Sequence, residues 1–300
     1  MSSASLDILA IAAHRDDVEQ TCGGTLLKMA ERENRTGILD LTQGEMGTRG
    51  TADDRAREAA EAAKILRVSW RQALDIPDGR VENTWENRLK VARVIRQTRP
   101  RVVILPYWEG RHPDHYTASK LGYEACFLAG LAKLDVERAL SSQQSAFSQV
   151  ASAVASVVAG EEQTSVGRAP SPAKLPSGGH GFSRADQPPQ ERPASAAGGA
   201  PHRPFKIIYA TLYYDIRPTF VVDITHQFET RFESLMAYKS QFSDQEAGKD
   251  IFPARAEIRS RIEAMARFYG MLAGVTYAEP FLQKEVGLVD DVTAIPVKSI

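Results

Sequence analysis

Two short segments of the sequence place histidines beside carboxylates. The first, AAHRDDVEQTCGG, covers residues 12 to 24, and the second, GRHPDH, covers residues 110 to 115. Together they supply three histidines and three carboxylates: His14, Asp16, Asp17, His112, Asp114 and His115. Imidazole and carboxylate groups can hold a divalent metal such as zinc, and they also serve as general acids and bases. The two segments indicate hydrolytic chemistry if the fold brings them together.

The surrounding sequence alternates between apolar runs and segments of helical period. This pattern predicts an α/β fold with a Rossmann-like, doubly wound, mostly parallel sheet and helices on both faces. The expected strands cover residues 6 to 14, 36 to 42, 71 to 77, 101 to 108, 205 to 214 and 219 to 225. The expected helices cover residues 23 to 33, 53 to 66, 84 to 99 and 115 to 134, with two more from about residues 227 and 255.

Each of the two segments follows the end of an expected strand. In a doubly wound sheet, ligands bind beyond the carboxyl ends of the strands where the strand order reverses, and the first and fourth strands are commonly neighbours there. We therefore expect both segments to border one crevice.

Within that crevice the residue types favour particular roles. His14, Asp17 and His115 would form a two-histidine, one-carboxylate metal triad with open positions for water and substrate. Asp16 is then free to act as general base on a water whose pKa the metal lowers toward about 7. Asp114 would orient and charge His112, whose imidazolium would face the developing oxyanion and could protonate a leaving amine.

Taken alone, each segment also has a purely structural interpretation. The first could be a helix N-terminus with favourable acidic residues, and the second could be a polar turn. Two such segments, each at a strand end, favour the metal site.

The segment from residue 141 to residue 204 differs in composition from the rest of the chain. It is rich in Ser, Ala, Gly, Pro and Gln and has one Leu, no Ile, no Trp and no Tyr. Such a segment cannot offset its ordering entropy by burial. We expect one domain formed by residues 1–140 and 205–300, with 141–204 as a disordered insertion whose His180 and His202 are solvated.

The overall composition indicates an ordinary water-soluble protein. The formal net charge of -1 and the pI of about 6.6 give no reason to expect nucleic acid or a membrane surface as partner. The N-terminus has no basic region and only a short apolar stretch, so we expect a cytoplasmic protein. Cys22 and Cys126 are far apart and outside any zinc-ligand spacing, which predicts two free thiols.

The residues also resemble a known family. AHRDDVEQTCGGTL together with RHPDH resembles the LmbE/PIG-L zinc-dependent deacetylases, whose first motif usually begins AHPDD. Further segments resemble the branch that deacetylates N-acetylglucosaminyl malate in bacillithiol biosynthesis: LDILAIAAH, DLTQGEMGTRGT, IPDG, PYWEGRHPDH, EACFLAGLAK, FVVDIT, AYKSQF and YAEPF. The resemblance covers nearly the whole chain outside 141–204.

The resemblance implies a Rossmann-like fold and a divalent metal, usually zinc, at the positions of His14, Asp17 and His115. It implies Asp16 as general base and an Asp114-supported His112 near the oxyanion. It also implies a small amino-sugar conjugate as substrate and a homo-oligomer, since relatives in this branch are often hexamers.

Three arginines near the expected crevice need separate interpretation. Arg15 stands where the family has proline, which would preset the loop backbone; we favour a solvent-facing Arg15 over substrate contact. Arg49 lies in the Gly-rich segment after the second strand, where a guanidinium suits a malate carboxylate. Arg111 is a second candidate clamp, although a structural ion pair would explain either Arg49 or Arg111.

The metal-binding, base and electrophile residues predict a metal-dependent hydrolase. The family resemblance alone implies that it removes acetyl from N-acetylglucosaminyl malate. One alternative is a deacetylase of another N-acetylglucosamine-containing substrate. A nucleotide-binding Rossmann protein is disfavoured because no G-x-G-x-x-G follows the first strand. A metal-free binding relative, disabled by Arg15 and using its insertion to dock a partner, is the remaining alternative.

Overall fold

The described residues of the chain form one seven-stranded sheet, with helices on both faces. The computed structural model describes residues 5–143, 199–211, 215–243 and 253–295. The strand order is β3-β2-β1-β4-β5-β7-β6. The strands are β1 Ile8–Ala12, β2 Thr36–Asp40, β3 Trp70–Ala73, β4 Val102–Pro106, β5 Lys206–Ala210, β6 Phe220–Asp223 and β7 Ala278–Leu282.

The first five strands of the chain are parallel, while β7 runs antiparallel to its neighbours β5 and β6. The chain moves outward from β1 through β2 to β3, and then returns to place β4 on the other side of β1. The strand order therefore reverses between β1 and β4. This is the position where the connections leave the sheet in opposite directions and a crevice opens.

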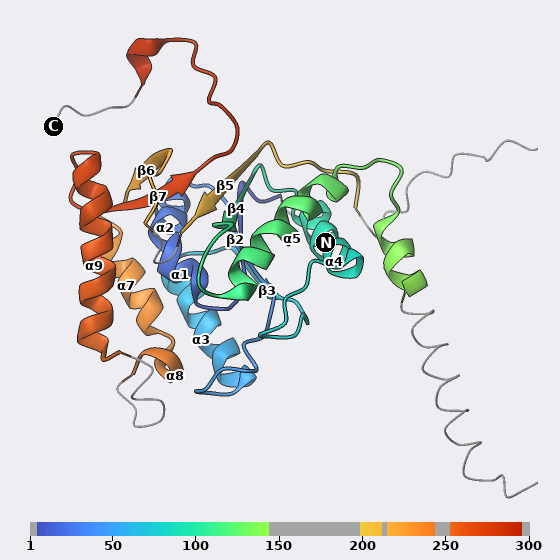
Figure 1. Cartoon of the computed structure of the whole chain (residues 1–300), viewed down its shortest axis with the longest axis horizontal. Helices are drawn as coiled ribbons and strands as arrows, with labels where there is room; N and C mark the ends of the chain where they lie inside the picture. The colour runs from blue at the N-terminus through green and yellow to red at the C-terminus, as the bar shows by residue number, and fades with distance from the viewer. Residues whose placement is uncertain (1–4, 144–198, 212–214, 244–252, 296–300) are drawn as a thin grey trace, which may run out of the picture.

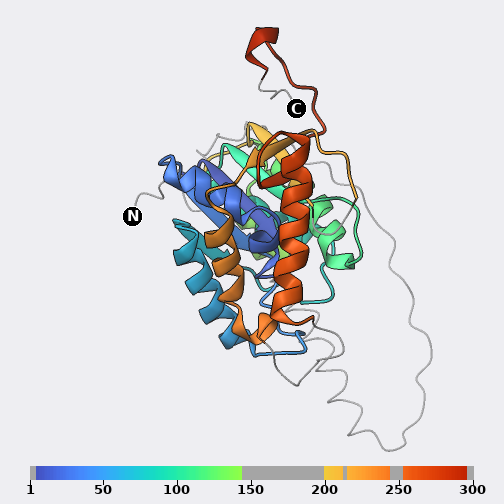
Figure 2. The same cartoon turned by 90° about the vertical axis from the view of Figure 1, so that its left-hand side faces the viewer.

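Helices cover the two faces of the sheet unequally (Figures 1 and 2). They are α1 Asp17–Thr21, α2 Gly23–Glu31, α3 Ala52–Ile65, α4 Trp85–Thr98, α5 Pro113–Ala129, α7 Phe228–Met236, α8 Lys239–Phe242 and α9 Arg255–Leu272. Helices α4 and α5 pack together on one face. Helices α1, α2, α3 and α7 lie on the other face, and α9 packs against β6 and β7.

Alternation along β1 creates a core on each face. Leu9 and Ile11 pack into the core under α4 and α5, whereas Ala10 and Ala12 face α1 and α2. A parallel strand in the middle of such a sheet must be apolar on both sides, which explains the unbroken apolar run at the start of the chain. The residues that follow Ala12 therefore emerge at the carboxyl edge of the sheet.

Local sequence fixes the starts of the helices that border this edge. Thr51 and Asp54 form a capping box at the start of α3. Pro113 occupies the first turn of α5, where its missing N–H costs nothing, and His112 caps that helix through Nδ1. His112, which was expected to take part in catalysis, thus also ends the loop that leads into α5.

The predicted α/β fold with a mostly parallel sheet is confirmed, but β7 was missed. The AEPFL strand contains Pro280, which usually argues against a strand, and Glu279, which interrupts its apolar pattern. Glu279 is buried and accepts hydrogen bonds from the backbone N–H groups of Gly24 and Thr25 at the start of α2. An ion pair with Arg231 completes its partners.

Most of the expected insertion, including His180, lies outside the described residues. His202 lies inside them and departs from the expectation of a solvated side chain. It is half-buried, with its Nε2 atom 2.7 Å from the carbonyl oxygen of Pro100, and its backbone N–H bonds to Ala129. Residues 136 to 143 are helical, so order also extends past residue 140.

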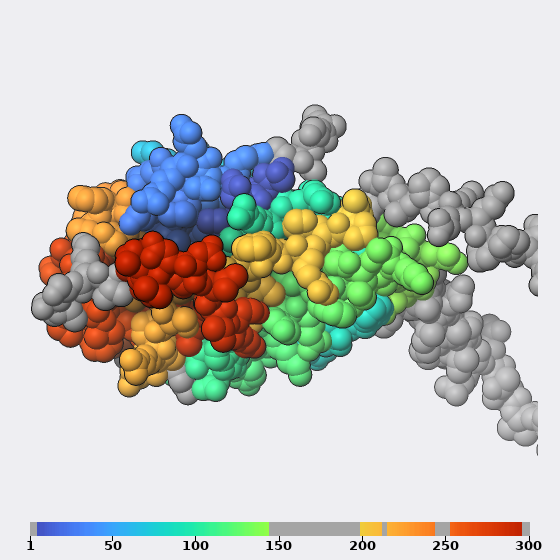
Figure 3. Space-filling model, turned by 90° about the horizontal axis from the view of Figure 1, so that it is seen from above, coloured from blue at the N-terminus to red at the C-terminus, as the bar shows by residue number. Residues whose placement is uncertain are grey.

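The segment after β7 extends away from the sheet in Figure 1 and is the red segment nearest the viewer in Figure 3. Its Val286 and Leu288 side chains are almost fully exposed. Within the described parts of the chain, no helix combines the length and apolar character needed to cross a membrane.

Candidate metal and catalytic site

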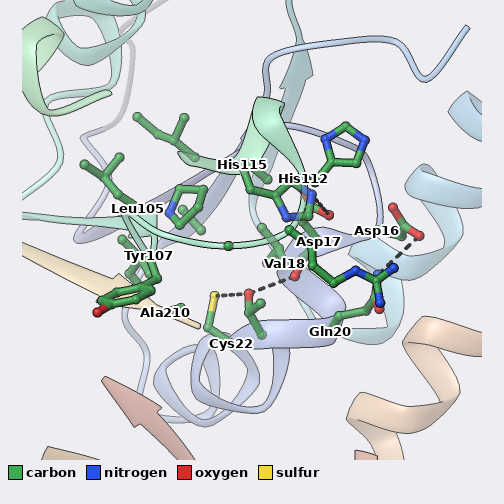
Figure 4. A pocket seen from close by; sticks show the side chains of 18 of the residues that line it. Asp16, Asp17, Val18, Gln20, Cys22, Leu105, Tyr107, His112, His115 and Ala210 are labelled. Carbon is green, nitrogen blue, oxygen red and sulfur yellow. Dashed lines mark hydrogen bonds and ion pairs between the residues drawn. The ribbon is translucent and has the colours of Figure 1, made fainter. Parts of the chain in front are cut away.

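The two histidine and aspartate segments meet at the point where the strand order reverses. Residues 8 to 10 of β1 pair in register with residues 102 to 104 of β4. The loop after β1 carries the first segment into α1, and the loop after β4 carries the second into α5. Their side chains face a common pocket in Figure 4. The expected crevice between the first and fourth strands is thus present.

His14, Asp17 and His115 lie in mutual contact. The Nδ1 atom of His14 lies 3.2 Å from Nε2 of His115 and 3.5 Å from Oδ2 of Asp17. The second Asp17 oxygen, Oδ1, lies 3.2 Å from Nε2 of His115. Asp17 is further fixed because its Oδ2 accepts a hydrogen bond from the backbone N–H of His14. Three potential ligand groups from two distant segments thus converge on one point.

The other nitrogen of His14 faces two more carboxylates. Its Nε2 lies 3.1 Å from Asp78 and 3.3 Å from Asp114. Asp114 is itself held by the backbone N–H groups of Gly79 and Val81. A carboxylate behind a metal-binding imidazole fixes the ring and its tautomer, and this arrangement leaves Nδ1 available to a ligand.

The charges around His14 favour a cation at this position. Burial would lower the pKa of His14, but the Asp17, Asp114 and Asp78 carboxylates outweigh it and raise the pKa to about 12. For Asp17 the signs are reversed: burial raises the pKa of its carboxyl group, but His115 and His14 bring that pKa well below its usual range. The donor set of imidazoles and carboxylates is one that suits zinc or a similar divalent ion.

A second grouping of possible ligands overlaps the expected triad. His14, His112 and His115 bring one nitrogen each within 4.8 Å of one another, as do ligand atoms of His14, Asp78 and Asp114. His112 packs edge-on against His14 and is stacked on His115. His112 therefore competes with Asp17 for the third ligand position.

Asp16 lies beside this cluster and is restrained by two neighbours. Its Oδ1 forms an ion pair of 3.1 Å with Arg55 of α3, and its Oδ2 accepts from the Gln20 side chain at 3.3 Å. Burial raises the pKa of Asp16, with a further contribution from Asp17, while Arg55 opposes the shift. A carboxyl group with a raised pKa is a better proton acceptor near neutral pH, as general base catalysis requires.

The expected pairing of Asp114 with His112 differs from the observed contacts. The Asp114 carboxylate contacts His14, and only the backbone N–H of Asp114 bonds to Nδ1 of His112. Burial lowers the pKa of His112, and the neighbouring His14 and His115 lower it further. The arrangement thus favours a neutral His112, because helix capping directs its Nδ1 toward the backbone and two imidazoles crowd its ring.

The substrate role expected for Arg49 is not supported by its position. Arg49 is buried and donates to the carbonyl oxygens of Gln241 and Ser243, while the Gln241 side chain donates to the Arg49 carbonyl. It thereby ties the loop after β2 to α8, and it is absent from the described residues that line the pocket. Arg111, by contrast, is exposed and does line it.

The expectation of a solvent-facing Arg15 was wrong. Its side chain is buried and donates from Nη1 to the carbonyl oxygen of Ala52 at 2.8 Å, at the start of α3. The Arg15 carbonyl oxygen accepts hydrogen bonds from Arg71 and from the Tyr238 hydroxyl. These contacts fix the backbone between His14 and Asp17. They replace the restraint that the proline of the family motif would otherwise supply at this position.

Beside the cluster is a cavity of about 680 Å³. Its polar lining includes Asp16, Asp17, His112 and His115. Tyr107 is part of its wall, while Trp108 packs edge-on against Tyr209 at the border of the core. A cavity of this size can hold a sugar-sized ligand.

Three neighbours of the site were not singled out from sequence. Asp78 follows β3 in the IPDG motif, so the strand-end rule applied to the third strand would have found it. Arg55 and Tyr238 gave no local signal, because each comes from a helical region and reaches the site only through tertiary packing. Cys22 and Cys126 are both free, as predicted, and both are buried.

The fold and the cluster define an α/β protein with a candidate metal site beside a buried carboxylate. A family model described as "GlcNAc-PI de-N-acetylase" (PIG-L) matches residues 9–126. The chain is 30% identical over 125 residues, 67% of the relative and 40% of this chain, to the uncharacterized deacetylase YaiS of Escherichia coli K12. It is 27% identical over 283 residues, 80% of the relative and 91% of this chain, to the diacetylchitobiose deacetylase of Thermococcus kodakarensis.

A solved structure extends the likeness to nearly the full length of both chains. The conserved protein TT1542 from Thermus thermophilus is 31% identical, with a TM-score of 0.67, and the match covers 95% of this chain and 98% of that one. The chain belongs to the PIG-L family. It is an N-deacetylase, a hydrolase that cleaves amide bonds.

Proposed function

We propose that the chain is a divalent-metal-dependent deacetylase that removes the N-acetyl group from an N-acetylglucosamine conjugate. The convergence of His14, Asp17 and His115, with Asp16 beside them, is the observation that carries the proposal. His14, Asp17 and His115 would hold the ion. Zinc fits this donor set, and His112 remains an alternative third ligand.

A bound divalent ion would polarise the amide carbonyl and lower the pKa of a water molecule toward about 7. Asp16 accepts a proton from the water that attacks the carbonyl carbon. Arg55 and Gln20 hold the Asp16 carboxylate in place, so that it does not have to be ordered during the reaction.

Breakdown of the tetrahedral species completes the reaction. The C–N bond breaks, the leaving nitrogen takes up the proton that Asp16 accepted from the water, and acetate and a free amine are released. His112 lines the pocket beside His14 and is the imidazole available to contact the oxyanion or the leaving nitrogen. Its lowered pKa suits a neutral hydrogen-bond donor better than a permanent imidazolium.

For the particular substrate we propose N-acetylglucosaminyl malate, the conjugate of bacillithiol biosynthesis. Besides the sequence resemblance, two cationic side chains at the cavity support an anionic substrate: Arg111 from the loop after β4, and Arg261 from α9, which also pairs with Glu257. Guanidinium groups suit carboxylates. The Thermococcus relative favours the second candidate, an N-acetylglucosamine oligosaccharide, since its name gives diacetylchitobiose as its substrate.

Acetate release tests the proposal directly. The protein is loaded with zinc, its metal content is measured, and N-acetylglucosaminyl malate is compared with diacetylchitobiose. Turnover of the malate conjugate at least tenfold above that of the disaccharide supports the anionic substrate. Equal turnover or the reverse order replaces it with a neutral sugar, and metal binding without release of acetate from either rejects both.

A further inference from the structure

The cavity beside the metal cluster has a second, apolar region that the reaction does not explain. This apolar region is defined by its lining residues: Ala10, Ala12, Val18, Cys22, Ile104, Ala210 and Ile258. All of them are at most 5% exposed. It is contiguous with the part of the cavity lined by Asp17 and His115, so a ligand can extend from one into the other.

The floor of the apolar region is one face of the sheet. Ala10 is in register with Ile104, and Ala210 of β5 pairs with the end of β4. Alanines on β1 and β5, the two strands that flank β4, leave this space open where a packed α/β core normally carries larger aliphatic residues. In Figure 4, Ala210, Cys22 and Tyr107 lie together on one side of the pocket, whereas Asp16 and Gln20 lie on the other.

The substrate has two parts that could enter this region, the acyl group and the amine-bearing sugar. A sugar brings hydroxyl groups, and burying a hydroxyl without a partner is costly. Two hydroxyl-bearing side chains, Thr21 and Tyr107, line the cavity. The Thr21 hydroxyl already donates to the Asp17 carbonyl and contacts the Cys22 sulfur. Burial raises the pKa of the Cys22 thiol, so it stays neutral. The apolar region therefore suits hydrocarbon.

We propose that the apolar region binds the acyl side of the scissile amide and accepts N-acyl groups longer than acetyl. The inference rests on the proposed deacetylase function and specifies its acyl range. With the carbonyl carbon at the metal cluster, the acyl chain points toward Cys22 and Ala210, and the sugar points toward Arg111 and Arg261. An acetyl methyl group fills only the entrance of this region.

The chemistry is the same for each acyl length. Water adds to the carbonyl carbon, the C–N bond breaks, and the carboxylate of the acyl chain leaves with the free amine. Each further methylene that enters the region removes apolar surface from water, an effect of up to about fourfold in binding. A substrate with a longer acyl chain would instead be rejected if the apolar region were too narrow to admit the added methylene.

The acyl range is measured with a series of three substrates and the zinc-loaded full chain. The substrates are N-acetyl-, N-propionyl- and N-butyryl-glucosamine. We expect kcat/KM to hold or rise from acetyl to butyryl, by up to about fourfold per methylene. A fall of more than tenfold from acetyl to butyryl overturns the inference while leaving the deacetylase function in place.

Variants of the floor locate the effect. Ala210→Val adds side-chain volume that fills the region, and it is expected to lower the butyryl-to-acetyl ratio of kcat/KM at least fivefold. Ile104→Val removes a methyl group, which widens the region, and it is expected to raise the ratio. Ile208→Leu is the matched control, because Ile208 lies on the same strand and sheet face but does not line the cavity. An unchanged ratio in Ala210→Val, with a native circular dichroism spectrum, contradicts the assignment.

Product binding gives a readout that needs no turnover. Calorimetry on the zinc-loaded protein is expected to show butyrate binding more tightly than acetate, with the preference lost in Ala210→Val. If no N-acyl sugar is hydrolysed at all, the proposed function fails, and this comparison still tests the region. Equal affinity for acetate and butyrate overturns the acyl region in either case.

Discussion

The Asp17 carboxylate contacts the His115 imidazole across the boundary between the two motifs, with Oδ1 3.2 Å from Nε2. Asp17 begins α1 and His115 lies in the first turn of α5, so the contact exists only because β1 and β4 are neighbours. We expect Asp17→Asn and His115→Gln each to lower zinc affinity at least tenfold. Chelator competition measures this directly.

The choice between Asp17 and His112 as the third ligand is open to a matched comparison. If Asp17 coordinates, His112→Gln keeps about one zinc per chain and loses mainly kcat, because the contact with the oxyanion or leaving group disappears. If His112 coordinates, its variant loses zinc as readily as His115→Gln. Metal analysis after dialysis against a weak chelator separates the two outcomes.

Asp16→Ala is expected to retain zinc but lose about 10²- to 10⁴-fold in kcat, the usual contribution of a general base. Because Arg55 restrains the Asp16 carboxylate, Arg55→Ala is expected to lower kcat as well without removing zinc. Arg57→Ala is the control, since Arg57 is exposed on the same helix and pairs with Asp54. Loss of zinc from Asp16→Ala would make Asp16 a ligand instead.

Zinc removal is expected to lower the thermal midpoint of unfolding. The His14 ring is surrounded by Asp17, Asp78 and Asp114, and a cation that binds only the folded cluster stabilises it by about 2.7 kcal/mol at a hundredfold excess over Kd. Differential scanning calorimetry with and without a chelator tests this. An identical midpoint in both conditions, with zinc shown to bind, would contradict the expectation.

The strand-end rule located the site because it depends on topology rather than on side-chain detail. Once the apolar runs at β1 and β4 were recognised, the parallel sheet placed His14 and His115 on the same edge. The directions of Arg15, Arg49 and the Asp114 carboxylate could not be obtained in this way. Each depends on a backbone partner that only the packed tertiary structure supplies: the Ala52 carbonyl, the Gln241 carbonyl and the Gly79 N–H.

Thiol chemistry provides a test of burial that is independent of the metal. Burial raises the pKa of Cys126 to about 12, so almost no thiolate is present at pH 8. We expect Cys126 to resist a bulky thiol reagent in the native protein and to react within minutes in denaturant. Peptide mapping of the alkylated protein identifies the site, and rapid native labelling would contradict the described packing.

Tyr238 lies between α7 and α8, and its hydroxyl connects this region to the loop between His14 and Asp17. Removing the hydroxyl tests the contribution of this contact. The hydroxyl donates to the Arg15 carbonyl and lies 3.1 Å from Glu19, with both Tyr238 and Glu19 fully buried. Tyr238→Phe leaves these acceptors short of a partner and is expected to lower the free energy of unfolding by about 1–3 kcal/mol. Urea denaturation measures the change, with the exposed Tyr123→Phe as control.

The same variant should act on the metal site as well as on stability. Because the Arg15 carbonyl belongs to the loop between His14 and Asp17, its loss of a partner loosens the geometry of both proposed ligands. We expect zinc affinity in Tyr238→Phe to fall about 10- to 100-fold, as is typical when an outer contact of a metal site is removed. A variant that is less stable but binds zinc with wild-type affinity would show that Arg71, which also donates to that carbonyl, is sufficient to hold the loop.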